Sequence, residues 1–253
     1  MSSEPVWPER YDRILLDRVD STSLEAARRA SDLHVPTWIF AREQTAGRGR
    51  RGRAWSMPQG NFAASLIWNP GGELADHALR SFVASLALRD ALTGLGVEHL
   101  SLKWPNDVLL KGRKLAGILL ESAPAERLIL GIGINLAATP DPAQLETRAV
   151  QPVALTPETG IEVSPEAMLT HLAAAFATRE AQMVTRGFAS IREDWLEHAA
   201  GKGGSLTARL PNATHQGIFE DVDGAGHLIL RTNADRLSLA AADVFFEGET
   251  ICS

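Results

Sequence analysis

The chain of 253 residues contains a single cysteine, at position 252, so no intramolecular disulfide can form. No apolar run approaches the ~18 residues that a membrane-spanning helix requires. The first residues show neither a basic start nor an apolar stretch, so we expect no signal peptide. The seven histidines are scattered without the spacing of metal ligands, which predicts no zinc site. Together these absences favour a protein of the reducing cytoplasm that is not bound to a membrane.

The charge balance excludes a surface built as a whole to attract nucleic acid, because the formal net charge is −6. The apolar content of 45% is that of an ordinary globular protein, and the length suits one large domain or a large and a small one. Any anion binding must therefore come from a local patch.

Such a patch is present at Gly47–Arg53, where four arginines and three glycines occupy seven positions. Glycine lets the backbone approach a ligand closely, and arginine supplies a fork of donors that matches phosphate or carboxylate. Long disordered Arg/Gly tracts bind RNA, but this run is short and lies between two apolar, strand-like segments. We interpret it as the loop of an anion pocket, and hence as a sign of an enzyme.

The first half of the chain predicts alternating strands and helices. Strands are expected at 13–19, 37–41 and 61–68, and apolar spacing predicts a helix over 75–95. A further helix should open after Asp20, with Thr22 and Glu25 spaced as a capping box.

The second half predicts a different organisation. From 101 to 136, strands are joined by turns too short for helical crossovers, so this part of the sheet should be antiparallel. A proline-containing loop without aromatics is expected at 137–159, followed by amphipathic helices at 166–184 and 188–198. After Gly201 the pattern changes to short strands separated by polar turns, which predicts a small β-barrel. We therefore expect an α+β protein with two domains, 1–201 and 202–253.

Several polar positions have two interpretations from pattern alone. Gln44 and the Ser21–Thr22 pair suit a strand end and a helix cap, or binding of an amide or urea group. The segment Lys103–Asp107 suits a proline-containing turn, or a nucleotide site with Mg²⁺ at Asp107. In the strand that follows Lys114, an interior Gly117 suits either a sheet edge or close approach of a ligand.

Other motifs are weak. Gly131 and Gly133 form a Gly-x-Gly pair, but the third glycine of a dinucleotide-binding fingerprint is missing. Asp221–Gly224 is similar to a calcium loop but lacks the distant glutamate, so a β-turn is expected. There is no Walker loop and no Gly-x-Ser-x-Gly elbow.

Five segments in order make the chain resemble the biotin protein ligases, which attach biotin to the carrier domains of carboxylases. They are Asp20–Ser23, Gln44–Trp55, Lys103–Asp107, Lys114–Glu121 and Gly131–Asn135. The resemblance covers almost the whole chain and includes the β-rich end with its Ala-Asp-Val-Phe-Phe.

The resemblance implies a mixed central sheet with helices, related to class II aminoacyl-tRNA synthetases, and a C-terminal SH3-like barrel. It implies ATP with Mg²⁺ and two reactions. Biotin and ATP form biotinyl-AMP and pyrophosphate, and a lysine of the biotin carboxyl carrier protein, of acetyl-CoA carboxylase or a related carboxylase, then takes the biotinyl group. The expected enzyme is a cytoplasmic monomer or homodimer.

The resemblance also implies the site residues. For biotin these are Ser21, Thr22, Ser23, Gln44, Gly47, Arg48, Gly49, Arg50, Lys114 and Gly117. For ATP they are Arg48, Arg50, Arg53, Trp55, Lys103, Asn106, Asp107, Lys114 and Asn135. Lys114 and Arg48 should be catalytic, with Lys114 bridging the biotin carboxylate and the α-phosphate, and Asp107 is the candidate Mg²⁺ ligand.

Two departures from the family are visible. Some relatives close a tryptophan over the adenine from the segment after Gly-Ile-Asn, whereas 137–159 here has no aromatic residue. Any cover would have to use Val150, Val153 or Leu155, and we expect this segment and the cationic loop to order when ligands bind. Other relatives begin with a winged-helix DNA-binding domain, and with Ser21 so early we expect none, and no operator binding.

Two other functions compete with this interpretation. A lipoate ligase of similar fold would need a longer apolar channel and would not require Gln44 or the Ser-Thr pair. A nucleic-acid-binding protein would use the Arg/Gly loop alone, but the sequence lacks a second basic patch.

Overall fold

The computed structural model describes residues 5–141, 143 and 150–246. Within them, the large sheet contains β1 (Asp12–Val19), β2 (Thr37–Gln44), β3 (Phe62–Trp68), β4 (Leu100–Lys103), β5 (Asp107–Leu110), β6 (Arg113–Ala123) and β7 (Arg127–Ile134). The helices are α1 (Thr22–Arg28), α2 (Arg80–Gly94), α3 (Leu155–Thr159), α4 (Pro165–Arg186) and α5 (Phe188–Glu197). Two 3₁₀ turns are η1 (Arg50–Gly52) and η2 (Leu74–Leu79).

The large sheet has seven strands in the order β1-β2-β3-β7-β6-β5-β4, among the described residues. β1 and β2 pair in parallel, and every other neighbouring pair is antiparallel. The sheet is therefore mixed, and the prediction of antiparallel pairing over 101–136 is confirmed. At the β4 edge, Leu102 exchanges backbone hydrogen bonds with His198 and Ala200, so the chain that leaves α5 covers that edge.

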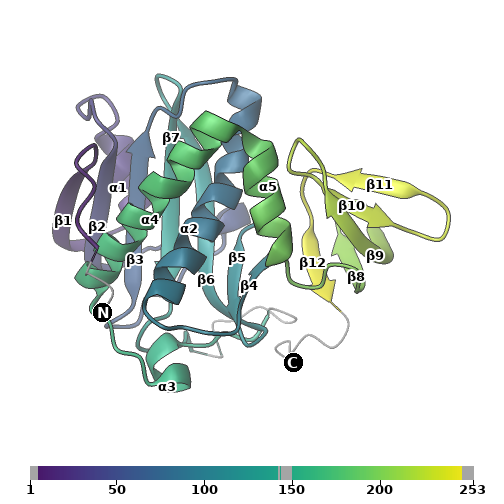
Figure 1. Ribbon diagram of the computed structural model, residues 1–253. Coiled ribbons are helices and arrows are strands. Elements are labelled where there is room, and N and C mark those ends of the chain that lie inside the picture. The colour runs from purple at the N-terminus through teal and green to yellow at the C-terminus, as the bar shows by residue number, and fades with distance from the viewer. Residues whose placement is uncertain (1–4, 142, 144–149, 247–253) are drawn as a thin grey trace.

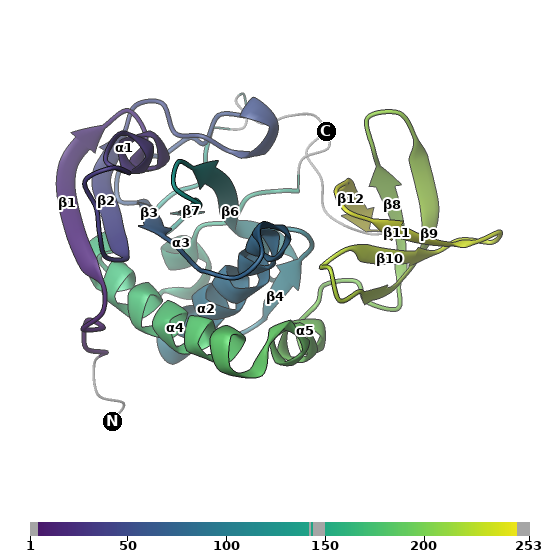
Figure 2. The same ribbon diagram turned by 90° about the horizontal axis from the view of Figure 1, so that it is seen from above.

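The two faces of the large sheet are covered differently (Figures 1 and 2). Helices α2, α4 and α5 lie on one face, over a core that includes Trp38, Leu66, Leu86 and Phe176. Helix α1 lies on the opposite face, where the buried cluster is small. The two faces can differ in this way because successive side chains of a strand point to opposite faces, so each strand can present large residues to one face and small residues to the other.

The face that carries α1 has small side chains at its centre. On β3 the residues facing α1 include Ala63 and Ser65, and on β7 the paired positions are Gly133 and Gly131. Large apolar side chains occupy the alternating positions on the other face. The sequence of these strands therefore leaves room for a cavity on one side of the sheet while filling a core on the other.

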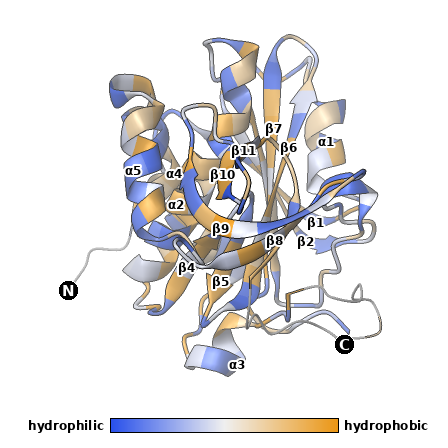
Figure 3. Ribbon diagram, turned by 90° about the vertical axis from the view of Figure 1, so that its right-hand side faces the viewer, coloured by the Kyte–Doolittle hydropathy of each residue, from blue (hydrophilic) through white to orange (hydrophobic). Residues whose placement is uncertain are grey.

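The C-terminal part forms a second, antiparallel sheet of β8 (Ser205–Arg209), β9 (Thr214–Val222), β10 (Leu228–Arg231), β11 (Arg236–Leu239) and β12 (Asp243–Phe246). Its order among the described residues is β11-β10-β9-β8-β12. It lies beside the β4 end of the large sheet (Figures 1 and 2). In Figure 3, α5 shows both hydrophilic and hydrophobic segments, and its buried residues are Ile191 and Trp195.

The two sheets are joined by specific contacts. The indole Nε1 of Trp104 donates to the carbonyl of Gly226 at 3.0 Å, which links the β4–β5 turn to the β9–β10 turn. Arg192 of α5 bonds the Asp221 carboxylate and the Val222 carbonyl. The turn at Asp223 is closed by its own carboxylate, which accepts from Ala225 N and His227 N, so the β-turn prediction is confirmed.

Three local predictions are wrong in detail. Thr22 does not cap α1: the N-cap is Ser21, whose side chain bonds no helix N–H, and the Thr22 hydroxyl bonds across to β2 and β3. The expected loop 137–159 contains α3, because Gly160 with φ 74° ends a short helix there. The expected helix 75–95 begins as the 3₁₀ turn η2 before α2.

Candidate active site

One cavity of about 720 Å³ lies on the α1 face of the large sheet. Within the described part of the chain, all sixteen residues that the sequence nominated line it: Ser21, Thr22, Ser23, Gln44, Gly47, Arg48, Gly49, Arg50, Arg53, Trp55, Lys103, Asn106, Asp107, Lys114, Gly117 and Asn135. They come from the start of α1, from the end of β2 and the loop after it, and from β4 to β7 with the turns that join or follow these strands. The fold therefore brings the separate segments together, while the role of each residue stays a prediction.

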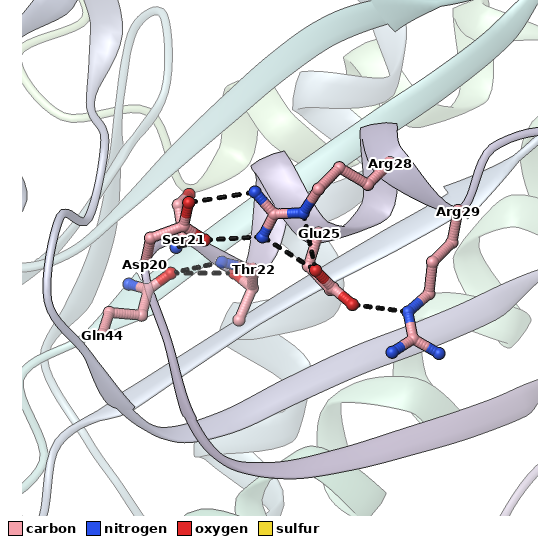
Figure 4. A network of polar contacts seen from close by, with 7 residues as sticks. All are labelled: Asp20, Ser21, Thr22, Glu25, Arg28, Arg29 and Gln44. Atoms are coloured by element: carbon pink, nitrogen blue, oxygen red, sulfur yellow. Dashed lines mark hydrogen bonds and ion pairs between the residues drawn. The ribbon is translucent and has the colours of Figure 1, made fainter.

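A cluster of hydroxyls and one amide forms the end of the cavity near α1. Gln44 Oε1 accepts hydrogen bonds from Thr22 N at 2.8 Å and from Thr22 Oγ1 at 3.0 Å (Figure 4). The Thr22 hydroxyl has only one proton, so it must accept from Ser65 Oγ, 2.8 Å away. Ser65 in turn lies 3.0 Å from Ser23 Oγ. This one-way chain orients Gln44 so that its Nε2 lies toward Gly47.

The start of α1 is fixed from outside the cavity by a carboxylate. Arg28 donates to both oxygens of Asp20, at 3.0 and 2.7 Å, and Ser21 N donates to Asp20 Oδ1 at 2.7 Å (Figure 4). The Arg28 hydrogen bonds, followed by that of Ser21 N, lower the pKa of Asp20 to about 2. The carboxylate is ionised at neutral pH and holds the turn that presents Ser21 to the cavity.

The cationic loop, Gly47–Arg53, folds back on itself as a tight turn. Gly49 N donates to Arg53 O at 2.8 Å, and Trp55 N donates to Gly47 O at 2.9 Å. Arg51 takes φ 57°, in the left-handed region, and Gly52 follows with φ 75°. A side chain on Gly47 would place its Cβ 2.5 Å from the Trp55 carbonyl, so this position requires glycine.

Each arginine of the cationic loop has a polar partner. Arg48 pairs with Glu121 of β6 at 2.8 Å, and Arg50 donates to Asn106 Oδ1 at 3.0 Å. Arg51 and Arg53 both reach Asp243 of β12, at 2.6 and 3.2 Å. Burial lowers the pKa of Arg50, in spite of the nearby Asp107 charge. The loop is thereby held over the cavity by the large sheet and by the C-terminal sheet.

Lys114 sits at an irregularity in β6. The register between β5 and β6 shifts at Val108/Leu109, which pairs Leu109 with Lys114 and leaves Leu115 as the extra residue. Such a bulge re-aims a side chain. The backbone of Lys114 also bonds the returning chain, through Gln151 O at 2.8 Å and Val153 N at 2.9 Å. The ammonium lies 2.7 Å from Asp107 Oδ1.

Trp55 lies against the floor of the cavity. Gly117 of β6 and Gly133 of β7 are direct partners across the strands. A Cβ on Gly133 would lie 2.3 Å from Trp55 Cε2, and one on Gly117 would lie 3.1 Å from Trp55 Cζ3. The indole therefore rests on a platform made by two glycines, with the Lys114 ammonium 5.9 Å from its ring centre. Trp55 therefore lines the cavity.

The remaining nominated residues are the buried Lys103 and Asn135. Lys103 Nζ lies 5.9 Å from the ring centre of Phe245 and 5.3 Å from that of Phe246, both on β12. Asn135 Nδ2 reaches Lys114 O at 3.4 Å, and its backbone receives Leu155 N at 2.8 Å. Both residues connect the cavity to segments that are distant in sequence.

The sequence analysis assigned no site role to several residues that line the cavity or bond its lining. They are Ser65, Glu121, Gly131, Gly133, Arg209 and Asp243. A Cβ on Gly131 would lie 2.7 Å from Ser23 Oγ, so Gly131 makes room for the hydroxyl cluster. Gly131 and Gly133 share one face of β7, and that period-two spacing was the signal available for them. For Asp243 and Arg209 the sequence held no signal, because their position depends on how the second sheet docks.

No group of three or more His, Cys, Asp or Glu side chains in the described part of the chain is arranged to hold a metal ion. Nor does any described helix have the length and hydropathy that spanning a bilayer requires. The segment 137–159 is described only in part, but the three residues expected to cover the adenine, Val150, Val153 and Leu155, are all within the described ranges. Val150 lines the cavity, whereas Val153 and Leu155 are buried in the core. Residues 142 and 144–149 lie outside the described residues.

Two family models match this chain. The Biotin/lipoate A/B protein ligase family matches residues 15–136, and the Biotin protein ligase C terminal domain matches residues 206–247. The first range includes the α1 hydroxyls, the cationic loop and Lys114, and the second includes Arg209 and Asp243.

Curated relatives match over most of their length. A Biotin--[acetyl-CoA-carboxylase] ligase of Paracoccus denitrificans is 50% identical over 241 residues, which are 92% of this chain and 100% of the relative. The Bifunctional ligase/repressor BirA of Bacillus subtilis is 30% identical over 231 residues, 88% of this chain and 71% of the relative.

Among solved structures, the fold is similar to that of the biotin protein ligase from Aquifex aeolicus in complex with biotin and ATP. The TM-score is 0.79 at 24% identity, covering 93% of this chain and 99% of that one. At this identity the likeness concerns the fold.

Proposed function

Because the chain belongs to the biotin protein ligase family, we propose that it joins biotin to ATP as biotinyl-AMP and transfers the biotinyl group to a lysine of the biotin carboxyl carrier protein of acetyl-CoA carboxylase. The observation that carries this proposal is the convergence of a hydroxyl–amide cluster and a set of cations in one cavity. The cluster suits the uncharged ureido ring of biotin, and the cations suit a carboxylate and a triphosphate.

The chemistry of the first reaction requires cations that are already in place. A carboxylate oxygen of biotin attacks the α-phosphorus of ATP, the new O–P bond forms, and the bond to the β-phosphate oxygen breaks to release pyrophosphate. Both reactants are anions, and negative charge accumulates where they meet. Lys114 and Arg50 are our candidates to offset it, together with Arg48 once biotin has replaced its present partner, because charges fixed before the reaction begins need no rearrangement as it proceeds.

Lys114 is suited to bridge two anions. Its ammonium has three donors and forms an ion pair with Asp107, whose Oδ1 lies 2.7 Å away. Donors therefore remain for the biotin carboxylate and the α-phosphate. The bulge in β6 and the backbone bonds to the 151–153 segment hold Lys114 in place without ligand. In the second reaction the carrier lysine attacks the acyl carbon, and AMP leaves.

Arg48 requires a change of partner to act on biotin. Its guanidinium is paired with Glu121 at 2.8 Å, and the two side chains are 42% and 26% exposed. An exposed ion pair of this kind is worth at most about 1 kcal/mol. The biotin carboxylate can therefore replace Glu121 at small cost, which is compatible with the role that we propose for Arg48.

We further propose that Mg²⁺ enters with ATP and meets Asp107. Mg²⁺ is usually held by one or two carboxylates together with substrate phosphates. Asp107 Oδ1 is buried and accepts no well-aligned hydrogen bond, so its lone pairs have capacity for a positive partner in addition to the Lys114 ammonium. The ion would neutralise phosphate charge.

The finer features of the fold are also proposals. We propose that residues 1–201 form a catalytic domain related to class II aminoacyl-tRNA synthetases, and that 202–253 form an SH3-like barrel. Support for the boundary comes from the turn at Gly201–Gly204, which separates α5 from β8. We also place the enzyme in the cytoplasm, as a monomer or homodimer.

The proposed function is tested by incubating the full chain with biotin, ATP-Mg²⁺ and a biotin carboxyl carrier domain, followed by intact mass measurement of the carrier. We expect the mass to increase by one biotinyl group, only when ATP is present. Lipoate in place of biotin is the matched control. Transfer of lipoate but not biotin would replace this function with lipoate ligation, and no transfer of either would refute it.

A further inference from the structure

Part of the cavity wall comes from the C-terminal sheet. Arg209 of β8 and three residues of β12, Asp243, Val244 and Phe245, line the cavity together with residues of the large sheet. In the described part of the lining, six side chains are basic and only Asp107 and Asp243 are acidic, although the whole chain is acidic. The cavity is therefore a local region of positive charge, and Arg209 is one of its cations.

Arg209, Asp243 and Phe245 share one face of the small sheet. Asp243 and Arg209 are direct cross-strand partners, and Phe245 is opposite Thr207, so it is diagonal to Arg209. The alternating residues Ala208 and Val244 are buried. Strand alternation thus points Arg209 toward the cavity side and fixes it beside Asp243.

The guanidinium of Arg209 is held by a ring instead of a carboxylate. Its Cζ lies 5.1 Å from the ring centre of Phe245, and no acidic side chain in the described residues forms an ion pair with it. Phe245 also lies near Lys103 Nζ of β4, at 5.9 Å. An aromatic face stabilises a cation by a modest amount and leaves its N–H donors open. Phe245 therefore brings two cations, one from each sheet, to the same part of the cavity.

The acidic neighbour of Arg209 is already neutralised. Asp243 accepts from Arg51 at 2.6 Å and from Arg53 at 3.2 Å. Two guanidiniums on one carboxylate leave net positive charge around it, and Arg53 is one of the residues that the resemblance to the family implies for ATP. Arg209 lies directly across the strands from Asp243, so it is on the same side of the cavity as Arg53. Lys114 belongs to β6 of the large sheet, where it pairs with Asp107 instead.

From this placement we propose that Arg209 binds the β- and γ-phosphates of ATP, and so the pyrophosphate product, as a residue supplied by the C-terminal sheet. The inference rests on the proposed function and extends it to a residue outside the five sequence segments. Arginine donates in a fork that matches two phosphate oxygens, and its position beside Arg53 suits the end of the triphosphate. Docking of the C-terminal sheet thereby becomes part of nucleotide binding.

The test compares Arg209→Ala with Arg209→Lys, and with Arg231→Ala as a matched control on the same sheet. Arg231 is 60% exposed, is near Glu220 and does not line the cavity. We measure KM for ATP and biotin, KM for pyrophosphate in the reverse reaction from biotinyl-AMP, and the Kd of AMP. Losing a charge-assisted contact should raise the two phosphate-dependent KM values by about tenfold or more. The KM for biotin and the Kd of AMP should stay within about twofold, and Arg209→Lys should recover part of the loss.

The outcomes separate the possibilities. The assignment to the β- and γ-phosphates is overturned if Arg209→Ala has the same KM values for ATP and pyrophosphate as Arg231→Ala. It is also overturned if Arg209→Ala raises the Kd of AMP as much as the KM for ATP. If Arg209→Ala does not fold, as judged by circular dichroism, Arg209→Gln replaces it and the same criteria apply. If the unaltered chain releases no pyrophosphate with biotin and ATP, the proposed function itself fails, which is distinct from failure of the Arg209 assignment.

Discussion

Adding one methyl group at each of three glycines should damage different parts of the site to different degrees. The relevant positions are Gly131 and Gly133 on β7 and Gly117 on β6, all in extended backbone that alanine can adopt. Since alanine disfavours a strand less than glycine does, the backbone itself should not be destabilised. Any loss must come from what the new Cβ meets.

The distances set the expected order of the effects. At Gly133 the Cβ would lie 2.3, 2.5 and 2.6 Å from three ring atoms of Trp55, so the indole has to leave its platform. At Gly117 the nearest contact is 3.1 Å, which a shift of a few tenths of an ångström relieves. At Gly131 the Cβ would lie 2.7 Å from Ser23 Oγ. Overpacking of this kind costs about 1–3 kcal/mol, which is roughly 5- to 150-fold in kcat/KM.

We therefore expect Gly133→Ala to lower kcat/KM for ATP strongly and Gly117→Ala to lower it only a few-fold. We expect Gly131→Ala to raise KM for biotin while leaving KM for ATP nearly unchanged. The kinetics are measured by pyrophosphate release, and thermal unfolding is the control for folding. Displacement of Trp55 is measured as a change in its contribution to the total tryptophan fluorescence of the chain. The steric reasoning would be refuted by a Gly133→Ala enzyme with kcat/KM near that of the unaltered chain, or by a larger loss at Gly117 than at Gly133.

Three further substitutions test other parts of the site. Lys114→Ala should slow biotinyl-AMP formation by ~10²-fold or more, the usual effect of losing one charge-stabilising donor, measured as single-turnover pyrophosphate release; near-normal rates would remove its proposed role. Arg48→Ala should raise KM for biotin by about tenfold and release biotinyl-AMP earlier, measured by trapping free adenylate; retention equal to that of the unaltered chain would argue against the role of Arg48 in adenylate retention. Asn61→Ala should lower Tm by several degrees, because the buried Asn61 amide bonds Ala137 N, Ala138 N and Ala138 O. Losing these bonds costs at least about 2 kcal/mol, and each kcal/mol lowers Tm by about 2–4 °C in a chain of this size. An unchanged melting curve would contradict this expectation.

Most elements of the fold could be predicted because the signals are local. The strands at 13–19 and 61–68 and the helix at 166–184 lie within observed β1, β3 and α4, or differ by a residue at an end. Hydrophobic periodicity and short turns carry that information along the chain itself. The capping box failed for a tertiary reason, since Thr22 bonds Gln44 and Ser65 instead of its own helix.

The site was predicted in part. Ordered motifs identified residues that the structure places around one cavity, from Ser21 to Asn135. They did not identify Ser65, an unremarkable serine in an apolar strand that proves to connect two site hydroxyls. Nor did they show that Arg48 is paired with Glu121, a carboxylate 73 positions later in the chain.

The sequence by itself determined the family, the order of strands and helices, and the kinds of side chain available for the chemistry, because each of these is encoded in short, contiguous stretches. Only the tertiary structure decided which of those side chains face one another: the two-glycine floor beneath Trp55, the bulge that aims Lys114 at Asp107, and the docking of β8 and β12 against the cationic loop. These relations depend on strand register and on how two sheets pack, which are set by contacts between residues far apart in the chain.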